Sequence, residues 1–226
     1  PHALAPRQAM ASLHHRLVHA DTRIVQLLDP PFDVSQPSPG YIEGYVPGVR
    51  ENGGQYTHAA VWATLAFAEL GDAERAWELF GMLCPARHAS DEAAVQIYKV
   101  EPYVVAGDVY AFPPHAGRGG WTWYTGSAGW MYQLLVEALL GLRRRGNQVQ
   151  VKPLVPLDWN TFELRYRFES STYRITCRRA ISAADARVAI DGMSSADGSI
   201  TLADDGRTHE VVVDVWREPP SRQSPR

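Results

Sequence analysis

The spacing of apolar residues divides the chain into a helical part and a part made of strands. Before residue 146, apolar residues recur every three or four positions, which is the period of an amphipathic helix. This spacing predicts four helices, around residues 10–17, 61–66, 76–83 and 131–142. The Gly71-Asp72 pair between the second and third predicts the short turn of two antiparallel helices.

After Gly146-Asn147 the apolar period falls to two, which is typical of half-buried strands. The alternation predicts six short strands between residues 149 and 215, separated by the turn signals Asp191-Gly192, Asp197-Gly198 and Asp205-Gly206. We therefore expect an α+β fold, with a helical domain over 1–145 and a small antiparallel β-sandwich over 146–218. The polar, proline-rich residues 219–226 are expected to be disordered.

Composition narrows the class of protein without pointing to an activity. The chain has 226 residues, 45% of them hydrophobic and 21% charged, as in ordinary globular proteins. A net charge of -3 does not favour a nucleic-acid partner, and no apolar run or leader predicts a membrane span or signal peptide. A cytoplasmic location is the default expectation. Cys84 and Cys177 are expected to be reduced structural thiols, and His88 and His115 have no second ligand at metal spacing.

Two glycine-punctuated aromatic stretches, residues 48–58 and 121–130, run directly into predicted helices. Glycine lets the backbone approach a ligand, Trp and Tyr offer flat faces for sugar rings, and a helix N-terminus presents free N–H groups to an anion. Together the stretches predict a polar, carbohydrate-sized site between residues 45 and 130. Trp121 and Trp123 are its candidates for stacking on a sugar.

The helical part has long loops, over 20–57 and 84–124, and such loops are usually functional or belong to something larger. Three motifs lie in or beside them, at residues 44–62, 98–104 and 121–130. In order and spacing they resemble glycoside hydrolase family 94. This family includes cellobiose and chitobiose phosphorylases and the C-terminal region of cyclic β-1,2-glucan synthases. The Arg-Glu-Asn-Gly-Gly motif of this chain is most similar to that of the synthases. The resemblance covers roughly residues 5–178 and implies the C-terminal part of an (α/α)6 barrel followed by a small β-domain.

The resemblance implies inverting phosphorolysis of β-glucans, without a cofactor and with inorganic phosphate as co-substrate. Phosphate takes the place of the water and general base of an inverting glycosidase. By their match to the family motifs, His58, Thr125 and Gly126 are expected to bind phosphate. Arg50 and Glu51 are expected to contact the acceptor-side sugar.

The family's general acid is an Asp in a Gly-Asp-Trp-Asn-Asp-Gly stretch, and residues 1–44 contain nothing similar. Because the proton donor is missing, we expect the chain alone to be inactive and its partner to be the upstream half of the catalytic domain. That enzyme could be part of an inner-membrane synthase. The Asp158-Trp159-Asn160 triplet is expected to be a structural turn rather than a catalytic site.

Simpler interpretations remain open for each residue. Thr125 could be a helix N-cap, His58 a hydrogen-bonded core histidine, and Arg50 with Glu51 a surface ion pair. Three other tryptophans are expected in the core, at Trp62, Trp77 and Trp130. The alternative functions are a non-catalytic carbohydrate- or phosphate-binding remnant and an assembly module that acts through its β-domain.

Overall fold

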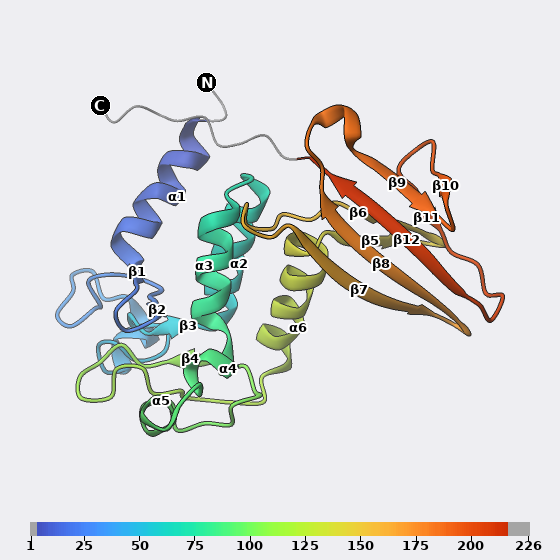
Figure 1. Ribbon diagram of the computed structural model, residues 1–226. Helices are drawn as coiled ribbons and strands as arrows, with labels where there is room; N and C mark the ends of the chain where they lie inside the picture. The colour runs from blue at the N-terminus through green and yellow to red at the C-terminus, as the bar shows by residue number, and fades with distance from the viewer. Residues whose placement is uncertain (1–3, 217–226) are drawn as a thin grey trace. The chain divides into compact units, whose positions relative to one another are not determined.

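The computed structural model describes residues 4–216, which form two compact units that divide between Leu139 and Leu140 (Figure 1). This division lies ahead of the change of apolar period at Gly146. The mixed helical and stranded content agrees with the expected α+β class. Residues 219–226, expected to be disordered, lie outside the described residues. No described helix combines the length and the apolar character that crossing a membrane requires.

The first unit is built on helices. Its elements are α1 (Leu4–Leu17), β1 (Val18–His19), β2 (Ile24–Val25), the 3-10 helix Gly40–Gly44, β3 (Gln55–Tyr56), α2 (Thr57–Glu69), α3 (Ala73–Leu83), α4 (Pro85–His88), α5 (Glu92–Tyr98), β4 (Asp108–Val109) and α6 (Thr125–Gln133). A π-helical segment, Leu134–Leu139, continues α6.

All four predicted helices are present, and α2 and α3 form the predicted hairpin (Figure 1). Gly71 ends α2 with a φ of 76°, a left-handed conformation that glycine adopts without strain. The Asp72 carboxylate caps α3 by accepting a hydrogen bond from the Arg75 N–H. Sequence periodicity missed α4 and α5 because they are only 4 and 7 residues long.

The core of this unit lies between α1, α2, α3 and the α6 region, with Val61, Leu79 and Leu139 fully buried. The prediction that Trp62 belongs to this core is wrong, because Trp62 is 52% exposed. Successive helical positions are about 100° apart, so the residue after Val61 points away from the core. Trp62 instead contacts the rings of His58 and Trp130.

The fourth predicted helix also ends earlier than expected, at Leu139 rather than residue 142. Gly141 has a φ of 73°, and a Cβ there would lie 2.1 Å from the backbone of Lys152. Only glycine fits this close approach, which the Lys152 N–H secures by donating to the Gly141 carbonyl. The chain therefore leaves the helix, and Leu142 begins a strand.

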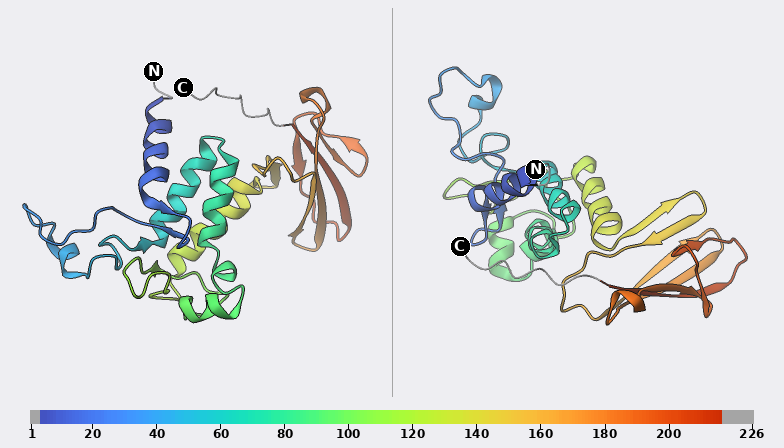
Figure 2. Two further views of the ribbon diagram at one scale, coloured as in Figure 1. Left: turned by 60° about the vertical axis from the view of Figure 1, so that its left-hand side comes forward. Right: turned by 90° about the horizontal axis from the view of Figure 1, so that it is seen from above.

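The second unit contains two sheets, seen from two further sides in Figure 2. The orders are β10-β9-β12-β8-β7 and β11-β6-β5. Their strands are β5 (Leu142–Arg145), β6 (Gln148–Val151), β7 (Thr161–Phe168), β8 (Ser171–Arg179), β9 (Arg187–Ile190), β10 (Met193–Ser194), β11 (Ser199–Thr201) and β12 (Thr208–Val215).

The expectation of a purely antiparallel unit is wrong for one pair, because β8 and β12 are parallel. A parallel pair needs a long connection, and the 3-10 helix Ala183–Asp185 with β9, β10 and β11 provides it. Apolar side chains of both sheets are buried, including Val149 of β6 and Ile175 of β8. Both cysteines are free, and burial raises the pKa of Cys177 to about 12.

The parallel pairing sets His209 beside Tyr173, with ring centroids 4.8 Å apart and nearly parallel planes. The His209 Nδ1 lies 2.8 Å from an Asp191 carboxylate oxygen, and its Nε2 lies 3.1 Å from Asp205. The hydrogen bond to Asp191 raises the pKa of His209 and lowers that of Asp191. The His209 ring thus joins two of the predicted turns.

We predict that His209→Gln lowers stability most at mildly acidic pH. The raised pKa means that stabilisation by His209 is complete below its unfolded pKa, about 6.5, and is lost as pH rises through the native value. Above about pH 4, the unfolded pKa of Asp, the carboxylates of Asp191 and Asp205 contribute their full stabilisation. Urea unfolding should show a loss of about 1–3 kcal/mol near pH 5.5 and a smaller one near pH 9.

His15→Gln, which changes an exposed histidine of α1, provides the control and should leave both values unchanged. An equal loss at both pH values would contradict a role for the charged imidazole.

Candidate functional site

A cavity of about 190 Å³ opens in the first unit, where three segments far apart in the sequence meet. Five of the residues selected from the sequence line it: Arg50, Glu51, His58, Trp121 and Gly126. The others that line it are Tyr45, Tyr56, Gly107, Asp108, Tyr124 and Ser127. Thr125 and Trp123 do not line the cavity.

The pairing of β3 with β4 brings the first two segments together. Tyr56 is opposite Asp108 in this antiparallel pair, and the Thr57 N–H donates to the Gly107 carbonyl at 3.0 Å. The buried side chain of Asn52 holds the preceding loop by bonding to the backbone of Phe32 and Tyr45. The start of α2, and His58 with it, is therefore fixed beside Gly107 and Asp108.

The start of α6 forms the wall next to His58. A Cβ built on Gly126 would lie 3.8 Å from the His58 ring, so helix backbone and imidazole are neighbours. Helix N-termini carry N–H groups without intrahelical partners, which suit an anion. The alternative that Thr125 is an N-cap is wrong, because Tyr124 has the extended backbone of the cap position and Thr125 is the first helical residue.

His58 is held by aromatic rings on several sides. Its ring lies parallel to Tyr56 at 6.5 Å and meets Trp62 edge-on at 4.7 Å. The His58 Nε2 is buried and has no hydrogen-bond partner within residues 4–216. That nitrogen therefore does not fit the alternative of a hydrogen-bonded core histidine.

Arg50 lies over Trp121 rather than in an ion pair. Its guanidinium carbon is 3.3 Å from the centre of the indole, and Tyr124 stacks with the same indole at 5.5 Å. In the described part of the chain no ion pair joins Arg50 to Glu51, so the surface-pair interpretation is wrong. Trp121 positions the guanidinium, a role that the sequence did not indicate.

Asp108 is the main residue that sequence reasoning missed. Its side chain is buried, and Oδ1 accepts a hydrogen bond from the Trp121 N–H at 2.9 Å. Burial raises the pKa of Asp108, and the nearby charge of Glu51 raises it further. The hydrogen bond from the Trp121 N–H and the charge of Arg50 lower it, but by less than burial raises it. The one available signal was a carboxylate inside the apolar run Val104-Val-Ala-Gly-Asp-Val109, since buried Asp is rare without a specific reason.

Three polar atoms around the cavity are buried without a hydrogen-bond partner in the described chain: Glu51 Oε2, His58 Nε2 and Asp108 Oδ2. Leaving such a group unsatisfied costs about 1–3 kcal/mol each. A ligand that offers hydroxyl groups and phosphate oxygens would remove part of this cost. No group of three or more His, Cys, Asp or Glu side chains within residues 4–216 could hold a metal ion.

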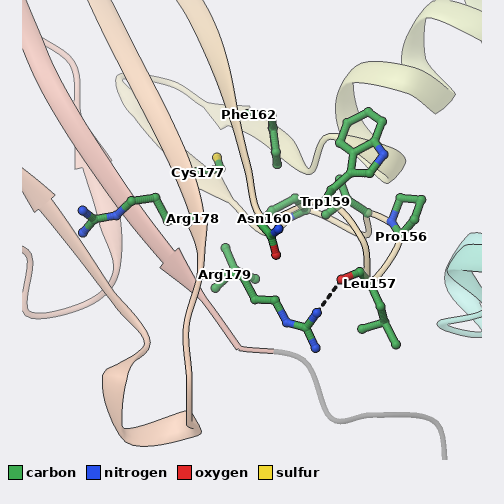
Figure 3. A pocket seen from close by; sticks show the side chains of 11 residues that line it. Pro156, Leu157, Trp159, Asn160, Phe162, Cys177, Arg178 and Arg179 are labelled. Atoms are coloured by element: carbon green, nitrogen blue, oxygen red, sulfur yellow. Dashed lines mark hydrogen bonds between the residues drawn. The ribbon is translucent and has the colours of Figure 1, made fainter.

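A second, smaller cavity, of about 40 Å³, lies in the other unit beside the Asp158-Trp159-Asn160 triplet (Figure 3). The Trp159 N–H donates to the Pro156 carbonyl, and the Arg179 guanidinium donates to the Leu157 carbonyl. These bonds confirm the predicted structural turn. Asp158 itself is exposed and does not line the cavity.

Residues 5–141 match the family model described as the catalytic domain of the glycosyl hydrolase 94 superfamily. The chain belongs to this superfamily. The resemblance carried by the three motifs is thereby confirmed for 137 residues that include the whole cavity, from Tyr45 to Ser127.

Relatives of the glycosyl hydrolase 94 chain include enzymes of two kinds. Cyclic beta-(1,2)-glucan synthase NdvB of Rhizobium meliloti (strain 1021) is 49% identical over 76% of this chain and 6% of its own length. Solabiose phosphorylase of Paenibacillus borealis is 30% identical over 83% of this chain and 24% of its own. N,N'-diacetylchitobiose phosphorylase of Vibrio furnissii is 30% identical over 65% and 18%. The chain therefore spans a quarter or less of these relatives.

We predict that Gly120→Ala damages the cavity. A Cβ at Gly120 would lie 2.3 Å from Asp108 Oδ1, so the carboxylate would have to move away from the Trp121 N–H. Such overpacking should lower the free energy of unfolding by about 1–3 kcal/mol.

Gly129→Ala is the matched control, because a Cβ there meets nothing within 4 Å and the residue lies inside α6. It should be neutral or stabilise by up to about 1 kcal/mol. Chemical denaturation of both variants checks the prediction, and equal stabilities would contradict it.

Proposed function

We propose that this chain contributes phosphate- and acceptor-sugar-binding residues to an inverting glycoside phosphorylase or a cyclic β-1,2-glucan synthase that acts on β-glucans. The observation that carries the proposal is the single cavity shared by His58, Gly126, Arg50 and Glu51. Membership of the glycosyl hydrolase 94 superfamily and the names of the relatives support it.

Charge divides the proposed site into two sides. Phosphate would bind between His58 and the start of α6, where the imidazole and the N–H groups at Gly126 can donate. Thr125 does not line the cavity, so we do not assign its hydroxyl to this phosphate. Glu51 and Asp108 would repel an anion, so we assign them to sugar hydroxyls, which donate to carboxylates. Arg50, held on Trp121, would contact the acceptor-side sugar. Trp123 does not line the cavity, so any sugar ring that it stacks on would lie outside it.

In the proposed reaction a phosphate oxygen attacks the anomeric carbon while an acid protonates the departing glycosidic oxygen. The products are an inverted sugar 1-phosphate and a shortened acceptor. The general-acid motif of the family has no counterpart in residues 1–44, so we propose that this chain does not carry the proton donor. General acid catalysis typically contributes 10²–10⁴-fold, and the chain alone should therefore show no turnover.

The same proposal includes the fold. The helices of the first unit would form the C-terminal part of an (α/α)6 barrel, and the two sheets of the second unit would form a β-sandwich domain. The partner would be the half of the catalytic domain that carries the acid, in the cytoplasm or on the cytoplasmic side of a membrane-bound synthase.

We predict that His58→Gln weakens the binding of inorganic phosphate to the chain. Loss of one hydrogen bond to a charged ligand should cost about 1.5–3 kcal/mol, or roughly ten- to 150-fold in Kd. Gly126→Ala should also weaken binding, because its methyl group would enter the cavity. Isothermal titration with phosphate provides the measurement, and His15→Gln is the control.

Unchanged phosphate affinity in both variants would contradict the assignment of His58 and Gly126 to phosphate binding. Release of glucose 1-phosphate from linear β-1,2-glucans by the chain alone would contradict the missing acid. Binding of β-glucan without any binding of phosphate would favour the alternative of a non-catalytic carbohydrate-binding remnant.

A further inference from the structure

Tyr103 and Trp123 form an exposed aromatic pair outside the wall of the cavity. They are 74% and 67% exposed, and Trp123 is the most exposed tryptophan among residues 4–216. Their ring centroids are 6.4 Å apart with planes at 71°, so the two rings meet edge to face. Single exposed rings are common on protein surfaces, but exposed rings that contact each other form a patch of the kind that marks binding sites.

The local structure holds Trp123 in this exposed position at a cost. Its φ is 64°, a left-handed conformation that a bulky residue rarely adopts and that persists only when the surroundings impose it. Its Nε1 donates a hydrogen bond to Glu101 at 3.0 Å. Because the indole is not packed into a core, burial does not explain why it is fixed.

Trp123 lies in the sequence between two residues of the cavity wall. Trp121 and Tyr124, which flank Trp123 in this loop, line the cavity and stack on each other. The guanidinium of Arg50 lies over the Trp121 ring. Trp123 and its neighbour Tyr103 are therefore more exposed than either Trp121 or Tyr124.

The chemistry of the pair suits a sugar ring. The C–H faces of glucose stack on aromatic rings, and a carboxylate such as Glu101 accepts hydrogen bonds from sugar hydroxyls. Hydrogen bonds from its own backbone N–H and from Trp123 lower the pKa of Glu101, which keeps it an acceptor at neutral pH. A glucan that leaves the cavity on this side would meet these groups next.

We propose that Tyr103, Trp123 and Glu101 form an outer sugar subsite that binds a glucosyl unit beyond those held in the cavity. This subsite rests on the proposed function and makes the protein favour longer β-glucans over disaccharides.

The test compares a disaccharide and a pentasaccharide of β-1,2-linked glucose, titrated calorimetrically into the 226-residue chain. Trp123→Asn and Tyr103→Ala should each weaken binding of the pentasaccharide roughly two- to tenfold and leave the disaccharide unchanged. Asn is chosen because it tolerates a positive φ, which protects the fold of the loop. Tyr132→Ala removes an equally exposed ring, from α6, and should change neither affinity.

An equal loss for both sugars would show that the pair only supports the loop, and unchanged pentasaccharide affinity would show that it does not bind sugar. Either result overturns the outer subsite, as does a parent chain that binds neither sugar. The phosphate titration decides the proposed function separately, since the His58 side of the cavity does not involve these rings.

Discussion

The short pairing of β3 with β4 is the constraint on which the candidate site depends. It joins segments far apart in the sequence and sets Tyr56 opposite Asp108 at the point where α2 begins. The Asp108 carboxylate then accepts from the Trp121 N–H, which ties the third segment to the other two. Gly120 is necessary for this arrangement, since any Cβ there would meet the carboxylate.

The cavity is assembled against the usual preferences of a stable fold. It leaves polar atoms of Glu51, His58 and Asp108 buried without partners in the described chain, and Arg50 and Trp123 have positive φ values. Unsatisfied groups and backbone strain of this kind tend to gather where function requires them. Two features of the same unit offset this cost in folding free energy. The side chain of Asn52 is fully hydrogen-bonded to backbone groups, and the apolar side chains of the helices are buried in a packed core.

The second unit shows the opposite pattern. His209 is hydrogen-bonded on both ring nitrogens and stacked on Tyr173, and the turn at Asp158-Trp159 is closed by backbone bonds. Its polar side chains are used to hold turns and strands together. The membership of the glycosyl hydrolase 94 superfamily, matched over residues 5–141, accordingly concerns the unit that contains the cavity.

The sequence by itself determined the four amphipathic helices, the change to strands, the family, and five residues that line the cavity. These follow from local periodicity and from long motifs, which a single segment carries. Tertiary structure alone decided that Asp108 belongs to the site, that Arg50 lies on Trp121, and that Thr125 stands outside the cavity wall. It also placed Trp62 at the surface and ended the last helix before Gly141. Trp62 points outward because of its position on its own helix. The physical reason for the other outcomes is that they depend on contacts between separate segments, and such contacts leave no period in the sequence of either one.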